Sequence, residues 1–94
     1  ESPFYPNDAA AMQRAHKRIV ESFPISRVYQ AHIPTYPSGH WLFGFASKKY
    51  HPLEDLQVAR WNSLNIRTDY YTTKLHEGCF YIPAYVERML RDVE

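Results

Sequence analysis

Apolar residues at helical spacing mark the first quarter of this 94-residue chain. Met12, Ala15 and Ile19 recur every three or four positions, while charged residues occupy the other faces. This pattern predicts an amphipathic helix over residues 8–23. Pro24 is expected to end the helix, because proline lacks the amide hydrogen and disfavours helical geometry in the residue before it.

Both ends of the chain carry further helix signals. Asn7 or Asp8 is the expected N-cap of the first helix, since a short acceptor side chain can satisfy an unpaired backbone N–H. Pro83 suits the first turn of a second helix, which we predict over residues 83–93. Its apolar stripe consists of Val86, Met89, Leu90 and Val93.

Two segments read as strands. Residues 27–33 are rich in β-branched and aromatic side chains, and residues 41–47 are apolar on both faces. A strand without alternation is normally covered on both sides, as in the middle of an α/β sheet. The chain offers few helices for this purpose, so the covering elements either lie outside it or belong to another subunit.

The rest of the chain gives weaker signals. Residues 48–65 are mixed and polar, with a short helical signal around 53–60. Residues 68–72 could form a brief strand, and residues 73–79 a helical turn. We therefore expect a long connection between the strand pair and the last helix.

Composition excludes several classes of protein. The formal net charge is +1 and no block of like charge occurs, so there is no electrostatic footprint for coating nucleic acid or anionic lipid. No apolar run approaches the ~20 residues of a membrane span. With no signal-peptide pattern and a single cysteine, Cys79, the composition favours a reducing cytoplasm.

Metal and nucleotide chemistry find little support in the spacing of residues. Only His76 and Cys79 are spaced like a ligand pair, and two ligands do not make a closed metal site. The neighbours of Cys79 are not activating, which favours a packed thiol over a nucleophile. There is no glycine-rich phosphate loop and no hydrolase or metalloprotease motif. We expect no metal in this chain.

One loop combines rigidity with aromatic side chains. Residues 34–40 contain two prolines and a glycine, which restrict Tyr36 to few conformations, and Trp41 follows directly. An acidic residue, Glu1, opens the chain. Aromatic faces and a carboxylate on rigid segments suit an organic cation. Alternatively, Tyr36 and Trp41 simply close one end of the sheet.

Four segments resemble the carboxy-terminal part of spermidine synthases, the polyamine aminopropyltransferases. They follow one another in family order and with family spacing. They are E-S-P-F at 1–4, I-P-T-Y-P-S-G-H-W at 33–41, A-S-K at 46–48 and Y-Y-T-T-K-L-H-E-G-C-F-Y-I-P at 70–83.

The resemblance implies a Rossmann-like, methyltransferase-type α/β fold with a mostly parallel seven-stranded sheet. This chain would supply its last helix, the closing antiparallel strand pair and the C-terminal helix. Residues 1–94 would then be the C-terminal portion of a single catalytic domain. The family's nucleotide-binding half and catalytic aspartate lie upstream, so the resemblance assigns no catalytic residue to this chain.

The reaction implied is transfer of an aminopropyl group from decarboxylated S-adenosylmethionine to putrescine, giving spermidine and methylthioadenosine. Other acceptors, namely spermidine, agmatine or cadaverine, stay open, as does a non-catalytic assembly module. The expected partners are putrescine, decarboxylated S-adenosylmethionine, the remainder of the same polypeptide and further copies in a homodimer or homotetramer. The 94 residues alone would be inactive.

The resemblance also implies which residues line the polyamine pocket. Tyr36 matches the tyrosine that contacts the polyamine, and Pro37 lines the same pocket. Glu1 matches a glutamate at the distal end, where the far amine is anchored. Tyr5 and Trp41 fall at positions that border the groove but vary in type within the family.

Overall fold

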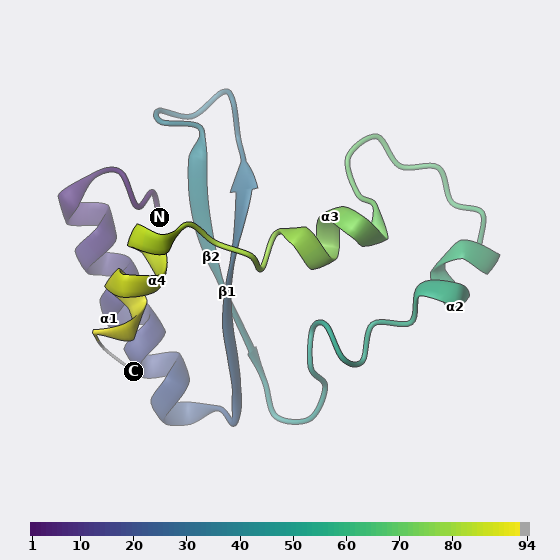
Figure 1. Cartoon of the computed structure of the whole chain (residues 1–94), viewed down its shortest axis with the longest axis horizontal. Helices are drawn as coiled ribbons and strands as arrows, with labels where there is room; N and C mark the ends of the chain where they lie inside the picture. Colours follow the sequence, from purple (N-terminus) through teal and green to yellow (C-terminus); the bar gives the residue numbers. More distant parts are fainter. Residues whose placement is uncertain (93–94) are drawn as a thin grey trace.

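The computed structural model describes residues 1–92 of the chain. A two-stranded hairpin stands in the middle, with two helices on one side and two shorter helices on the other (Figure 1). The elements in chain order are α1 (Pro6–Ser22), β1 (Ile25–His32), β2 (His40–Ser47), α2 (Val58–Ser63), α3 (Thr73–Gly78) and α4 (Ala84–Arg91).

β1 and β2 pair antiparallel over their full lengths, from Ile25 opposite Ser47 to His32 opposite His40. Because side chains alternate across a strand, Val28 shares one face of the hairpin with Leu42, and the next positions along each strand share the other. The strand pair predicted at 27–33 and 41–47 is confirmed. β1 begins two residues and β2 one residue earlier than predicted.

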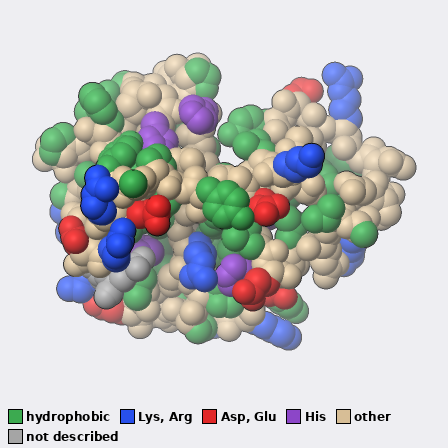
Figure 2. Space-filling view, viewed as in Figure 1, with side chains coloured by type: hydrophobic (Ala, Val, Ile, Leu, Met, Phe, Trp, Pro, Cys, Tyr) green, Lys and Arg blue, Asp and Glu red, His purple; other side chains and the backbone are tan. Residues whose placement is uncertain are grey.

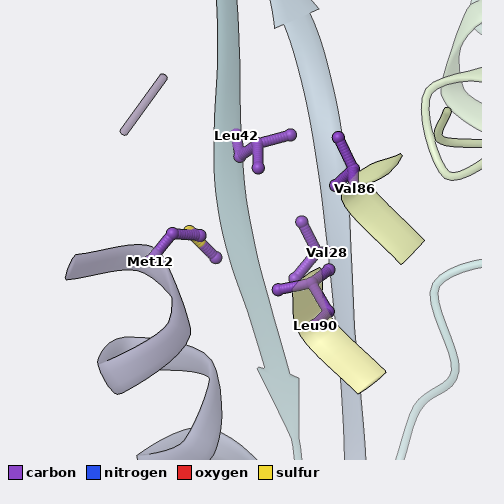
Figure 3. Packing of buried hydrophobic residues seen from close by; sticks show 5 residues of the cluster. All are labelled: Met12, Val28, Leu42, Val86 and Leu90. Carbon is purple, nitrogen blue, oxygen red and sulfur yellow. The ribbon is translucent and has the colours of Figure 1, made fainter. Parts of the chain in front are cut away.

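The core lies between one face of the hairpin and the helices α1 and α4. Figure 3 shows its five side chains converging from all four of these elements. Leu42 is 1% exposed and Val86 is fully buried, so the two are enclosed on every side. The buried residues are Met12, Val28, Leu42, Val86 and Leu90.

Polar contacts and a close approach fix α1 against its neighbours. The side-chain nitrogen of Gln13 donates to the carbonyl oxygen of Met89 at 2.8 Å, which ties α1 to α4. The Ser26 hydroxyl donates to the carbonyl oxygen of Ile19 at 3.2 Å near the end of α1. A β-carbon at Gly44 would lie 2.7 Å from Cδ1 of Ile19, so α1 lies close to β2 here, and a larger residue would require the end of the Ile19 side chain to move.

The first helix differs from its prediction in start and in cap. α1 begins at Pro6, because the amide hydrogen that proline lacks has no partner in the first turn of a helix. Tyr5 is the N-cap and makes no side-chain capping bond, so the predicted cap at Asn7 or Asp8 is wrong. The Asp8 carboxylate instead accepts from the backbone N–H of Ser2 at 3.4 Å.

The buried stripe of α1 is turned by one residue from the predicted one. Met12 is buried as expected, but Ala15 is exposed and His16 takes its place at 2% exposure. Spacings of four and three residues from Met12 through His16 to Ile19 describe the same helical face. The sequence pattern missed His16 because a histidine does not count as apolar.

In the long connection, the brief strand predicted at 68–72 is wrong. There the Thr68 hydroxyl donates to the carbonyl oxygen of Tyr71 at 2.6 Å, and the segment bends at residues 69–70. The helical signal at 53–60 corresponds to a shorter helix further on, α2. Residues before it form turns in which Nδ1 of His51 accepts backbone N–H groups.

The two remaining helices match their predictions. α3 coincides with the helical turn expected at 73–79, and the Thr72 hydroxyl caps it by accepting from the N–H of Leu75 at 2.9 Å. α4 confirms the last helix, with Pro83 as its N-cap. Val93, the last member of the predicted stripe, lies outside the described residues.

Charged side chains of both signs are mixed on the visible face of the chain. Lys and Arg lie among Asp and Glu on the face shown in Figure 2, as the net charge of +1 leads one to expect. Within residues 1–92, no helix has the length and apolar character needed to cross a membrane.

The central position of Leu42 gives a stability prediction. Leu42→Ala removes a side chain that is 1% exposed, so we expect the free energy of unfolding of the intact protein to fall by about 2–5 kcal/mol. Leu64→Ala is the matched control, since that leucine is 56% exposed and should change stability by less than about 0.5 kcal/mol. Urea unfolding measures both. Equal losses would contradict the core described above.

Candidate functional site

The loop between β1 and β2 is built from two consecutive turns. The N–H of Tyr36 donates to the carbonyl oxygen of Ile33 at 3.0 Å, and the N–H of Gly39 donates to the carbonyl oxygen of Tyr36 at 3.1 Å. A third bond, from the N–H of Ile33 to the carbonyl oxygen of Gly39 at 2.9 Å, closes the loop at its base. Tyr36 therefore sits where the two turns meet, on a closed backbone, with 55% of its surface exposed.

The second turn has type II geometry. Pro37 occupies its second position, where the fixed φ of proline is favourable, and Ser38 occupies the third with φ of 67°. Type II turns require a positive φ at that third position, where glycine is usual. Gly39 follows with φ of 69°. The loop thus carries a serine in a conformation that serine rarely adopts.

The first residues of the chain run beside this loop and are bonded to it. The hydroxyls of Ser2 and Ser38 share a hydrogen bond of 2.7 Å, and Ser2 is fully buried. The N–H of Leu42 donates to the carbonyl oxygen of Glu1 at 2.7 Å, and the backbone nitrogen of Glu1 donates back to Leu42 at 3.1 Å. Glu1 is therefore fixed on the edge of β2, next to the loop.

The aromatic residues of the candidate site fall into two groups. Tyr36 meets Trp41 edge to face, with ring centroids 5.6 Å apart. Trp41 Nε1 is buried and has no hydrogen-bond partner within residues 1–92. Tyr5 instead contacts Phe4, with centroids 5.1 Å apart, at the start of α1.

The structure thus brings together most of the residues predicted from the sequence. Glu1, Tyr36, Pro37 and Trp41 gather at the loop end of β2 through the bonds and ring contact described above. Tyr5 is different, because no hydrogen bond or ring contact within residues 1–92 joins it to the loop. An exposed ring, a half-buried indole and a nearby carboxylate residue are the elements of a cation site.

A polar network that the sequence did not reveal lies on the core-side face of the same end. Nε2 of His40 donates to the side-chain oxygen of Gln30 at 2.7 Å, and the Tyr85 hydroxyl bonds to Nδ1 of His40 at 3.2 Å. The Gln30 amide also donates to the carbonyl oxygen of Tyr81 at 3.1 Å, which fixes its orientation. The ring of His32 stacks on His40 with centroids 6.5 Å apart.

The pKa of His40 is lowered below its ordinary value of 6.5. Burial disfavours the charged imidazolium, and the neighbouring His32 adds a smaller effect in the same direction. The sequence holds one signal for this pair: His32 lies near the end of the first predicted strand, and His40 directly precedes the second. Their partners Gln30 and Tyr85 lie too far apart in sequence for a spacing argument.

His76 and Cys79 serve the packing of the chain. Nε2 of His76 donates to the carbonyl oxygen of Pro52 at 2.8 Å, while Nδ1 accepts from the Tyr71 hydroxyl at 2.8 Å. The thiol of Cys79 donates to the His76 carbonyl at 3.0 Å, and burial raises its pKa. Residues 1–92 contain no group of three or more His, Cys, Asp or Glu residues that could hold a metal ion.

An apolar cavity of about 320 Å³ lies between the hairpin and α3. None of its lining residues belongs to the first five residues or to the 33–41 loop, so it is separate from Tyr36. Tyr36 itself lies outside this cavity on an open surface, where it is 55% exposed. The residues lining the cavity are Tyr29, Gln30, Ala31, Phe45, Pro52, Tyr70, Tyr71, Leu75, His76, Cys79 and Phe80.

Solved structures contain the same arrangement of elements. The chain superimposes on a spermidine synthase from Thermotoga maritima with a TM-score of 0.87 and 36% identity, over 97% of this chain and 31% of that one. A spermidine synthase in complex with the transition state analogue AdoDATO matches with a TM-score of 0.88 and 36% identity. The fold expected from the sequence, the closing part of a Rossmann-like α/β domain, is thereby confirmed.

Sequence comparison leads to the same family. The polyamine aminopropyltransferase of Clostridium beijerinckii is 68% identical over 90 residues, and that of Alkaliphilus oremlandii is 64% identical over 94 residues. No protein-family profile matches the chain. The chain spans about a third of the length of these curated relatives, 32% and 33%. It belongs to the polyamine aminopropyltransferase family, as the sequence motifs indicated.

The lowered pKa of His40 predicts a pH dependence of stability. The folded protein binds a proton at His40 less readily than the unfolded chain, so stability is lost as pH falls from the unfolded value of 6.5 toward the lower folded pKa. His40→Gln removes the titrating group and should reduce this loss. We expect the effect in urea unfolding between about pH 7.5 and about pH 5.5.

A direct check is titration of the His40 ring followed by NMR in the intact protein. The midpoint should lie below 6.5. A midpoint at or above that value would contradict the desolvated environment formed with Gln30, Tyr85 and His32.

Proposed function

We propose that the protein carrying this chain is a spermidine synthase. It transfers an aminopropyl group from decarboxylated S-adenosylmethionine to putrescine, giving spermidine and methylthioadenosine. In this proposal residues 1–94 are the C-terminal portion of one catalytic domain, and the chain forms one wall of the polyamine pocket. Family membership supports the reaction class, and the related spermidine synthases of known structure support the product.

The observation that carries the proposal is the exposed ring of Tyr36 on its closed double turn. Its exposure of 55% leaves a ring face for a cationic substrate, and three backbone hydrogen bonds hold the loop in one conformation. Trp41 packs against the ring edge-on and restricts its rotation. A rigid aromatic surface attracts an ammonium group through the ring quadrupole without a large loss of side-chain entropy on binding.

The other pocket residues would each contact a different part of the diamine. Pro37 extends the apolar wall beside Tyr36 along the methylene chain. Glu1, fixed to β2 by two backbone bonds, supplies negative charge for the far ammonium group. Trp41 and Tyr5 border the groove, and the position of Tyr5 beside Phe4 gives it the smaller part.

The transfer reaction also requires catalytic groups that the pocket residues named above do not supply. The attacking amine must lose its proton before its nitrogen can attack the methylene carbon beside the sulfonium, and methylthioadenosine leaves with the electrons of the broken carbon–sulfur bond. The loop over residues 33–41 contains no Asp or Glu that could take this proton. We therefore assign deprotonation and donor binding to the remainder of the polypeptide, and we propose that the protein works in the cytoplasm as a homodimer or homotetramer.

Two alternatives follow from the same surface. Spermidine, agmatine or cadaverine could replace putrescine as acceptor, since the length of the pocket decides this choice and most of the pocket lies outside this chain. A non-catalytic assembly module of the same fold is the second alternative. It would use Tyr36 and Trp41 to close the end of the sheet.

An assay of the intact protein tests the proposal. Incubation with decarboxylated S-adenosylmethionine and each acceptor in turn should release methylthioadenosine fastest with putrescine. Faster release with another amine would reassign the acceptor. No release with any of the four amines would refute the enzymatic proposal and favour the assembly module.

Tyr36→Ala tests the wall itself. Loss of the ring should raise KM for putrescine by about 3- to 30-fold in the intact protein, because the cation–π contact is lost. KM for the nucleoside donor should change less than about twofold. Tyr36→Phe keeps the ring, so its KM for putrescine should stay near that of the parent protein. Tyr50→Ala is the matched control, since that tyrosine is 62% exposed and lies outside the loop.

A further inference from the structure

The third position of the type II turn poses a physical problem. Ser38 adopts a φ of 67°, although glycine would adopt it without steric cost, and a glycine is the next residue along the chain. A residue held in such a conformation persists when its surroundings fix it. The hydroxyl of Ser38 is the group through which the surroundings act.

Three hydrogen bonds converge on that hydroxyl. The N–H of His40 donates to it at 3.2 Å, it lies 3.2 Å from the carbonyl oxygen of His40, and it is 2.7 Å from the hydroxyl of Ser2. The Ser2 oxygen in turn accepts from the N–H of Phe4 at 3.3 Å. All of these bonds can exist at once if Ser2 donates to Ser38 and Ser38 donates to the His40 carbonyl.

Burial makes the bond between the two serines costly to lose. Ser2 is fully buried, so its hydroxyl cannot exchange Ser38 for water. A buried donor without a partner destabilises a structure more than a typical hydrogen bond stabilises it. The turn is therefore held from outside the loop, by a residue 36 positions away in the sequence.

We infer that the Ser2–Ser38 hydrogen bond is a positioning device for Tyr36. Ser38 follows Tyr36 by two residues in the same turn, so fixing its backbone fixes the direction of the Tyr36 ring. Ser2 also connects this turn to Glu1, its neighbour in the chain, which is paired with Leu42. The bond thus links the turn that carries Tyr36 to the backbone of Glu1. Its role in diamine binding depends on the proposed function, whereas its role in ordering the loop does not.

Ser38→Gly distinguishes an effect of the Ser38 hydroxyl bond from an effect of the backbone conformation alone. Glycine removes the strain of the positive φ but also removes the hydroxyl. If the conformation alone mattered, the variant would order the loop better than serine does. We expect the opposite, because the buried Ser2 hydroxyl loses its partner.

Hydrogen exchange in the intact protein without any substrate gives the first measurement. The amides of Tyr36 and Gly39 are hydrogen-bonded within the loop and report its opening. Ser38→Gly and Ser2→Ala should each speed their exchange by roughly 2- to 12-fold. The double variant should exchange no faster than Ser38→Gly alone, since both changes remove one shared bond. Unchanged or slower exchange in the single variants, or additive effects, would overturn the inference.

Steady-state kinetics gives the second measurement. Both single variants should raise KM for putrescine by roughly 2- to 12-fold while kcat at saturation and KM for the nucleoside donor stay within about twofold. General destabilisation would instead lower kcat through the active fraction and leave KM unchanged, which would count against a positioning role. Ser63→Ala is the matched control, since its hydroxyl donates to the carbonyl oxygen of Arg60 within α2, away from the loop.

Together, the two measurements test the proposed function and the positioning role of the Ser2–Ser38 bond independently. If the parent protein releases no methylthioadenosine with any amine, the proposed function fails, and hydrogen exchange still decides whether the bond orders the loop. If the parent is active and exchange is unchanged in the variants, the proposed function stands and the positioning role falls.

Discussion

The antiparallel register of β1 and β2 is the constraint from which the rest of the structure follows. It places Val28 and Leu42 on one face, where α1 and α4 cover them, and it brings His32 opposite His40. Pairing up to the last residues of both strands leaves only seven residues to turn the chain. A loop so short between paired strands must fold back on itself, and its two turns present Tyr36 outward.

The sequence predicted this framework well where side-chain pattern and backbone chemistry agree. The strand pair, α1 and α4 follow from apolar spacing, and the rigid loop follows from its two prolines. Tyr36, Trp41 and Glu1 stood out from their residue types and the rigidity of the loop, and resemblance to a family added Pro37 and the role expected of each. The structure then supplied what a pattern cannot, namely that Glu1 and the loop are neighbours in space.

The features that the sequence did not predict correctly each have a physical explanation. His16 is buried on α1, although histidine does not enter an apolar stripe. The predicted strand at 68–72 is overridden by a local bond of Thr68 to the backbone, which competes with sheet pairing. Ser2 is the clearest case, because a small polar residue in an extended segment gives no sign that it will be fully buried against a serine 36 positions later.

The pairing of Glu1 with Leu42 has a consequence for handling the chain by itself. Leu42 turns its amide and carbonyl away from β1, and by the period of a strand Gly44 and Ala46 do the same. Glu1 satisfies only the first of these three residues in the bonds described. The outer edge of β2 is therefore a template for a further strand, and preparations of the chain at high concentration should be watched for edge-to-edge aggregation.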